Sequence, residues 1–237
     1  SLYPGSEQSP ISRTKTITRR YLELSGMLEE ILLHKLQGPP PRHARDIPLT
    51  AVFSLAEMVV YSTVKAREMF LEVMHPNYRG DFLTCHSLNT AFLCCKVGLS
   101  LPLAYNDLIH LSVASLLHDI GMTKIDSSSY CHNRDLSKLE RSIIEEHPAK
   151  GREYLCNLEQ EFPWLVRTVH EEHMREDGKG YPAPTGGEQH LYARIVGLCD
   201  SYEALSHARS YRKALHPADA MKYVVEENKH IFPKTLM

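Results

Sequence analysis

The chain is organised around the sequence Leu116-Leu117-His118-Asp119-Ile120-Gly121-Met122-Thr123-Lys124. The preceding residues, Asn106 to Leu117, are mostly apolar at helical spacing, and Asn106 or Asp107 can cap the helix that they predict. This helix would deliver His118-Asp119 at its C-terminal end, where Gly121 lets the chain turn. Because a carboxylate can bridge two divalent cations while a neighbouring imidazole binds one, the pair is a candidate metal-binding element.

The composition is that of an ordinary globular protein. The chain has 237 residues, of which 43% are hydrophobic and 24% charged, enough for one large domain or a domain with a helical preface. Its formal net charge of -2 argues against a partner that is a nucleic acid polymer, which would call for a basic surplus. No apolar run approaches about 18 residues and no signal-peptide pattern is present, so we expect no membrane segment.

The cysteines and histidines are more informative. Six cysteines form no C-x-x-C pair, and four of them lie among apolar helical residues: Cys85, Cys94, Cys95 and Cys199. We therefore expect reduced thiols in the core and a cytoplasmic location. Fourteen histidines are a high number and justify a search for a metal site.

Helical patterns cover most of the chain. Residues 1–48 form an N-terminal extension with an amphipathic helix at 19–36 and a linker that starts at Gly38-Pro39-Pro40-Pro41. This extension could mediate a homodimer, couple a regulatory domain, or simply cover one side of the main domain. The main domain, 49–237, is expected to hold helices at roughly 49–73, 82–98, 106–121, 134–146, 149–158, 161–175, 188–207 and 217–229. Strand-like alternation is nearly absent, so we predict an all-α bundle whose facing helices supply interior side chains.

Four further residues are candidate ligands beside His118 and Asp119. His86 lies early in an apolar helix, and His147 precedes Pro148, which places it at a helix end. His173 ends a helix before a loop rich in glycine, and Asp200 lies within an apolar helix, where a buried carboxylate needs a cation or strong hydrogen bonds. Four imidazoles and two carboxylates fit a dinuclear iron or manganese site better than a structural zinc site, which would use thiolates.

In four ordered blocks, the sequence resembles the HD-GYP family, a branch of the HD metal-dependent phosphohydrolases. The resemblance covers roughly residues 81–230. Its blocks are His118-Asp119-Ile120-Gly121, His147-Pro148 with Gly151, Asp177-Gly178-Lys179-Gly180-Tyr181-Pro182, and the segment from Ala193 through Asp200 to Arg212.

The resemblance implies an HD-type helical bundle that hydrolyses cyclic di-GMP to linear pGpG, in some members onward to GMP, through a metal-bridging hydroxide. The two metal ions would be iron or, alternatively, manganese, with Asp119 as the bridge. Tyr181 matches a position that contacts the dinucleotide and could stack on guanine. Arg209 and Arg212, expected three apart on one helical face, would hold phosphate oxygens. The implied metal ligands are His86, His118, Asp119, His147, His173 and Asp200.

Three positions depart from the family pattern. The usual lysine after His-Asp-Ile-Gly is Met122 here, and Lys124 is the candidate for stabilising the phosphate or the leaving group. Glu172 replaces a histidine and could be an oxygen ligand or face solvent. Phe82 stands where members with three metals have glutamate, which favours two metals.

Three functions are compatible with these observations. The leading hypothesis is a cyclic di-GMP phosphodiesterase. The second is a catalytically weak cyclic di-GMP sensor or protein-interaction module, suggested by Met122. The third is an HD phosphohydrolase that acts on another nucleotide.

Overall fold

The computed structural model describes residues 10–129, 134–175, 177–183, 187–209 and 212–227. Within these ranges every regular element is a helix, and the only β pairing is an isolated bridge between Arg209 and Arg212. The predicted all-α fold is therefore confirmed. Among the described helices, none combines the length and the apolar character that a membrane span requires.

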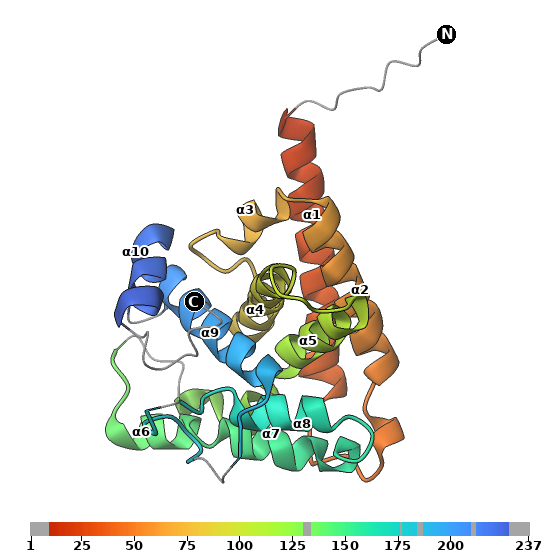
Figure 1. Ribbon diagram of the computed structural model, residues 1–237, viewed down its shortest axis with the longest axis vertical. Coiled ribbons are helices and arrows are strands. Elements are labelled where there is room, and N and C mark those ends of the chain that lie inside the picture. Colours follow the sequence, from red (N-terminus) through yellow and green to blue (C-terminus); the bar gives the residue numbers. More distant parts are fainter. Residues whose placement is uncertain (1–9, 130–133, 176, 184–186, 210–211, 228–237) are drawn as a thin grey trace.

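Helices α4, α5 and α9 cross in the middle of the molecule, with α1 and α2 along one side and α6, α7 and α8 grouped at one end (Figure 1). The elements in chain order are α1 (Pro10–Glu29), η1 (Glu30–Lys35), η2 (Ala44–Asp46), α2 (Leu49–Lys65), α3 (Met69–Val73), α4 (Phe82–Gly98), α5 (Tyr105–Leu117), η3 (Ile120–Lys124), η4 (Ser127–Ser129), α6 (Lys138–Ile144), α7 (His147–Leu155), η5 (Cys156–Leu158), α8 (Pro163–Glu171), α9 (Leu191–Ser206), α10 (Pro217–Lys222) and η6 (Tyr223–Glu227).

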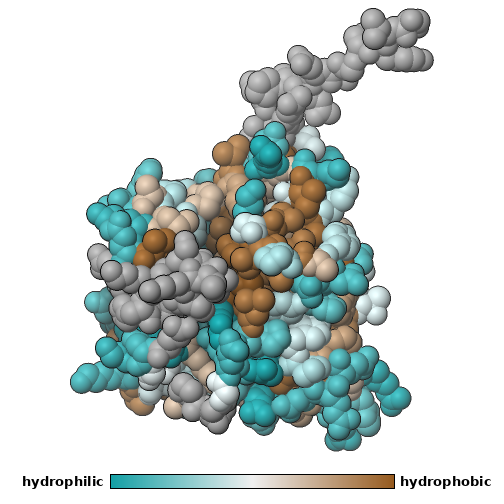
Figure 2. Space-filling view, in the orientation of Figure 1, coloured by the Kyte–Doolittle hydropathy of each residue, from teal (hydrophilic) through white to brown (hydrophobic). Residues whose placement is uncertain are grey.

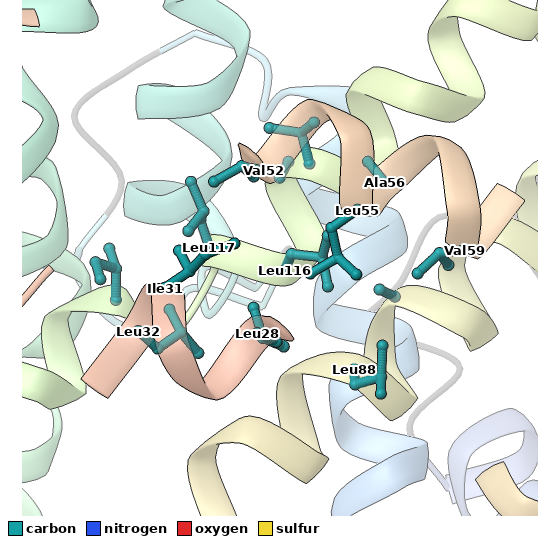
Figure 3. Packing of buried hydrophobic residues seen from close by; sticks show 14 of the residues in the cluster. Leu28, Ile31, Leu32, Val52, Leu55, Ala56, Val59, Leu88, Leu116 and Leu117 are labelled. Carbon is teal, nitrogen blue, oxygen red and sulfur yellow. The ribbon is translucent and has the colours of Figure 1, made fainter. Parts of the chain in front are cut away.

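One hydrophobic core joins the N-terminal helix to the rest of the molecule. Leu28 of α1 and Ile31 of η1 pack against Leu116 and Leu117 of α5 and against Leu55 of α2, all of them buried (Figure 3). The described part of residues 1–48 thus shares its core with the following helices rather than forming a core of its own. The four cysteines expected in the interior are buried and free: Cys85, Cys94, Cys95 and Cys199.

The single helix expected at 49–73 is broken in the structure. Helix α2 ends at Lys65, Ala66 leaves helical geometry at φ -126° and ψ 79°, and α3 begins at Met69. The break turns Met69 and Val73 into the core, where both are fully buried. Tertiary packing therefore overrides a continuous helical pattern here.

Hydrophobic side chains gather in the upper half of the face shown in Figure 2, around the region where α1, α3 and α4 lie in Figure 1. The lower half, over α6, α7 and α8, is mostly hydrophilic. The exposed apolar residues include Val64 of α2, Leu71 of α3 and Leu99, which follows α4. A contact with a second copy or a regulatory domain through the N-terminal helices stays a prediction.

The helix before His118-Asp119 forms, but its N-cap is not Asn106 or Asp107 as expected. Ala104 occupies the N-cap position, and Asp107 lies in the first turn, where its Oδ2 accepts a hydrogen bond from the Ala104 backbone N at 3.0 Å. The α-helix ends at Leu117, and a 3₁₀ turn, η3, follows Asp119.

Gly121 has a different role from the turn that was expected. It is not among the glycines with positive φ, and it is the point where η3 touches α7. A Cβ atom there would lie 1.9 Å from the His147 backbone O and 2.7 Å from the Gly151 backbone N. Gly121 is therefore required by close backbone packing, which holds the His118-Asp119 segment against His147.

Replacing Gly121 with alanine should lower the free energy of unfolding by about 3 kcal/mol, because the backbone of α7 must move to admit the new atom. Denaturant unfolding monitored by circular dichroism measures this change. Gly26→Ala is the matched control, since a Cβ at Gly26 in α1 meets nothing within 4 Å. That variant should gain about 1 kcal/mol from helix propensity. Equal stability of Gly121→Ala and the wild type would contradict the packing role.

Candidate metal centre

Asp119 lies at the centre of a cluster built from five segments. Its Oδ2 atom is 3.4 Å from His86 Nε2 of α4 and 3.5 Å from His118 Nε2 at the end of α5. Its Oδ1 atom is 3.2 Å from His147 Nε2 of α7. His173 follows α8, and its Nε2 is 3.1 Å from His147 Nε2. The four histidines therefore converge on a single carboxylate.

Asp200 of α9 completes the set of expected ligands. Its Oδ1 lies 3.0 Å from His86 Nε2, and its Oδ2 lies 3.9 Å from His173 Nδ1. It thus spans the two sides of the cluster. The structure brings all six side chains expected from the sequence into one site.

The ligand atoms form two groups that share Asp119. One group consists of Asp119, His147, Glu172 and His173, and the other of His86, His118 and Asp119. Within each group the ligand atoms all lie within 4.8 Å of one another. A carboxylate common to two such groups is suited to bridge two cations.

Three of the histidines are oriented through Nδ1. His118 Nδ1 lies 2.8 Å from the Ser115 carbonyl and His147 Nδ1 lies 2.8 Å from the Ile144 carbonyl, so each Nδ1 donates its proton. His86 Nδ1 lies 2.5 Å from the Glu203 carboxylate. In the neutral ring this leaves the lone pair on Nε2, which points toward Asp119. Anchoring the second nitrogen in this way is typical of metal-binding histidines.

Glu172 gives the clearest indication that the cluster is suited to bind a cation. Its side chain is buried, and neither Oε1 nor Oε2 accepts a hydrogen bond from the described residues. The nearest cationic group is His147 Nε2, at 3.7 Å. The alternative that Glu172 faces solvent is excluded by its burial. Since a buried carboxylate is costly without a partner, the donor set fits a bound metal ion. His118 Nε2 is likewise buried without a hydrogen bond.

In the absence of a metal ion, protons on the histidines balance the negative charge of the neighbouring carboxylates. Burial alone would raise the pKa of Asp119, but His118, His147 and His86 hold that pKa below its usual range. Burial alone would lower the pKa of His86, yet the interaction with Glu203 raises it to about 10. Glu172 has the same effect on His147, whose pKa rises to about 9 despite burial. A divalent cation would replace these protons, because a ligating imidazole must be neutral.

Glu203 is a candidate positioning residue that the sequence motifs did not indicate. It is fully buried on α9, and besides His86 its carboxylate accepts hydrogen bonds from Tyr78 Oη at 3.0 Å and Asn89 Nδ2 at 3.1 Å. Asn89 Oδ1 in turn accepts a hydrogen bond from Tyr21 Oη of α1 at 2.8 Å. The spacing of Glu203, three residues after Asp200 on one helix, was the available signal.

Glu203→Gln should weaken metal binding about 10- to 100-fold, because an amide cannot hold the His86 imidazole as a carboxylate does. Competition against a chromophoric chelator measures the affinity, and circular dichroism checks the helices. Glu188→Gln, at a glutamate whose side chain is 81% exposed, is the control. Unchanged affinity in Glu203→Gln would refute the orienting role.

A cleft of about 530 Å³ opens beside the cluster. His86, Asp119 and Asp200 form part of its lining, and so does Tyr181. The Tyr181 ring stacks on His173, with 4.7 Å between ring centroids. The structure therefore places Tyr181 where a bound base or ribose could contact it.

The two arginines are positioned differently from expectation. Helix α9 ends at Ser206, so Arg209 and Arg212 share no helical face and instead form a backbone bridge. Arg212 donates hydrogen bonds to the carbonyls of Ala204, Leu205 and Lys213, closing the end of α9. Arg209 lies over the Phe82 ring at 4.4 Å and 3.6 Å from the Glu203 carboxylate. Both line the cleft.

The structure does not bring Lys124 to the cluster. Its Nζ donates to the carbonyls of Leu36 at 2.7 Å and Gly38 at 2.9 Å, and it lies 3.9 Å from the centre of the Tyr154 ring. Residues of a 3₁₀ turn repeat every three positions, so Met122 lies on the side of Asp119 and Lys124 does not. Met122 lines the cleft in its place. The position of Lys124 therefore gives no support to the catalytic role expected for it.

An all-α molecule with two histidine–carboxylate groups that share one aspartate belongs to the class of metal-binding helical proteins. The family model for the HD domain matches residues 68–236, well over half of the chain. The chain therefore belongs to the HD domain family.

Its relatives confirm the resemblance to the HD-GYP branch. The chain is 26% identical over 194 residues to the cyclic di-GMP phosphodiesterase PA4108 of Pseudomonas aeruginosa, covering 81% of this chain and 47% of the relative. It is 27% identical over 208 residues to the 3'3'-cGAMP-specific phosphodiesterase 3 of Vibrio cholerae, covering 87% of this chain and 42% of the relative. The chain thus spans less than half the length of these curated relatives.

The fold is also that of a solved structure. Bd1817, an HDG"Y"P protein from Bdellovibrio bacteriovorus, superposes with a TM-score of 0.75 over 98% of this chain and 72% of the other, at 12% identity. This likeness supports the HD-type helical architecture.

Proposed function

We propose that this chain is a metal-dependent cyclic dinucleotide phosphodiesterase that hydrolyses cyclic di-GMP to linear pGpG. The observation that carries the proposal is the convergence of His86, His118, His147 and His173 on Asp119, next to the buried Glu172 carboxylate, which accepts no hydrogen bond from the described residues. A cleft of about 530 Å³, a volume usual for small-molecule sites, opens on this cluster. The names of the relatives supply the substrate class.

The proposed centre would hold two divalent ions. Asp119 would contact both, with His86 and His118 on one side and Glu172 with its neighbouring histidines on the other. Imidazole and carboxylate ligands without thiolate favour iron or manganese. Bound cations of this kind supply charge that neutralises phosphate oxygens and lowers the pKa of a water molecule.

The chain's own residues would orient the substrate. The Arg209 guanidinium lies over the Phe82 ring at the cleft and can face a phosphate oxygen. Tyr181, stiffened by its stack on His173, offers a surface for a base. Met122 and Leu205 add apolar side chains to the lining of the cleft.

A second candidate is a cyclic dinucleotide sensor with slow turnover. The positions of Met122 and Lys124 favour it, because the ammonium group two residues after Met122 is held by the carbonyls of Leu36 and Gly38. The cleft then carries no lysine among the described lining residues to stabilise a leaving group.

The test combines metal analysis with product analysis. Protein purified without air is analysed for metal content and then incubated with cyclic di-GMP, 3'3'-cGAMP or a nucleoside triphosphate. About two metal ions per chain and formation of pGpG support the enzyme. Tight binding with intact cyclic di-GMP supports the sensor. Turnover of the triphosphate alone would overturn the assigned substrate class.

A further inference from the structure

We propose that Arg141 and Arg175 bind the second phosphate of a cyclic dinucleotide, the one that is not being hydrolysed. The inference rests on the proposed function and concerns residues that neither the sequence motifs nor the metal centre involve. Both arginines line the cleft beside the metal cluster.

The chemistry of the substrate requires such a site. A cyclic dinucleotide carries two phosphodiester groups, each with one negative charge. Only one of them can lie at the metal centre in a given turnover. The other enters a cleft whose walls already contain the carboxylates Asp119 and Asp200, so it needs cations of its own.

The arginines expected from the sequence are already engaged. The Arg212 guanidinium is held by three carbonyl groups at the end of α9. The Arg209 guanidinium stacks on Phe82 and lies near the buried Glu203 carboxylate. Both guanidinium groups already contact the protein, and Arg209 is assigned to the phosphate at the metal centre. A second phosphate therefore calls for further donors, and the described lining of the cleft offers Arg141 and Arg175.

Arg141 and Arg175 are exposed, and their side chains form no hydrogen bond or ion pair with the residues that the structure describes. This distinguishes them from several exposed arginines elsewhere, each of which pairs with a glutamate: Arg134 with Glu140, Arg152 with Glu159, and Arg167 with Glu171. An unpaired guanidinium at the wall of a cleft is available to an anionic ligand, and its forked donors match phosphate oxygens.

Both arginines are placed by elements that also build the metal site. Arg141 lies on α6 one turn before Ile144, so the two share the helical face that lines the cleft. Ile144 also supplies the carbonyl that anchors His147. Arg175 follows His173 by two residues, and its segment is closed by a hydrogen bond of 3.0 Å from Tyr181 N to His173 O. The arginines are thus fixed relative to the metal ligands.

The test separates binding of the second phosphate from chemistry at the first. Arg141→Gln and Arg175→Gln should each raise KM for cyclic di-GMP about tenfold while kcat stays within about twofold. Hydrolysis of bis(p-nitrophenyl) phosphate, which has a single phosphodiester, should be unchanged in both variants. Arg152→Gln on α7 is the matched control, because its partner Glu159 is outside the cleft.

Each outcome has a separate meaning. If the wild type hydrolyses cyclic di-GMP and both variants keep its KM, the inference is overturned and the proposed function stands. An equal loss with bis(p-nitrophenyl) phosphate also overturns it, because the arginines would then act at the scissile phosphate or on the fold. If the wild type neither binds nor hydrolyses any cyclic dinucleotide, the proposed function and the inference both fail.

Discussion

Replacing Asp119 with alanine is expected to abolish metal loading and to lower hydrolysis of cyclic di-GMP about a thousandfold or more, because bound cations contribute several kcal/mol to the transition state. Asp119 is the only residue common to both ligand groups found among the described residues. Its removal would therefore affect both proposed cations, whereas removal of a histidine leaves one ligand group intact. Elemental analysis and single-turnover kinetics measure the two losses.

The fold should survive this change. Asp119 follows α5 and lies among histidines rather than in the apolar core, so its loss leaves the packing of Leu116 and Leu117 in place. Circular dichroism should show unchanged helix content. Asp126→Ala, at an exposed aspartate just beyond η3, is the control and should keep full activity. Wild-type metal content in Asp119→Ala would refute the assigned bridge.

Glu172→Gln is expected to remove about one metal ion per chain and to lower metal affinity at its site by 10-fold or more. The amide has the same shape but neither the charge nor the ligand strength of the carboxylate. In the metal-free protein above about pH 9, where His147 is neutral, the same change should leave stability equal or higher, because it removes a buried carboxylate that accepts no hydrogen bond from the described residues. The sign of the effect on thermal stability should therefore depend on metal.

Thermal unfolding with and without added metal tests this reversal, since a ligand stabilises in proportion to its affinity for the folded state. Glu172→His supplies the imidazole that the HD-GYP resemblance expects at this position, and it should retain two metal ions. Glu153→Gln, at an exposed glutamate of α7, is the control. Identical metal-induced shifts of Tm in wild type and Glu172→Gln would rule Glu172 out as a ligand.

Much of the site could be anticipated because ligand residue types are conspicuous in apolar helices. Asp200 directly follows the mostly apolar stretch Ile195–Cys199. A carboxylate buried in such a helix needs a cation or strong hydrogen bonds. His147, next to Pro148, had to lie at a helix end, and it is the first residue of α7. Periodicity alone placed α4 at its observed bounds, Phe82–Gly98.

Other features depend on contacts between distant segments. From the sequence, Glu172 could be either a metal ligand or a side chain that faces solvent. Its burial becomes visible only in the structure, where α7 packs against α8. Glu203 becomes a partner of His86 because α4 and α9 cross, although 117 residues separate the two. No local pattern reports which buried groups meet across such a crossing.

By itself the sequence determined the all-α class, the approximate helices and the six side chains that converge at the candidate metal centre, because burial patterns and ligand residue types are features of the local sequence. Only the tertiary structure decided which cationic side chains face the cleft. In the structure Lys124 donates a hydrogen bond to the Leu36 carbonyl, and Arg212 donates to a carbonyl at the end of α9. Arg141 and Arg175 remain at the wall of the cleft. The physical reason is that a long cationic side chain binds whichever acceptors the fold brings within reach, and those acceptors lie far away in the sequence.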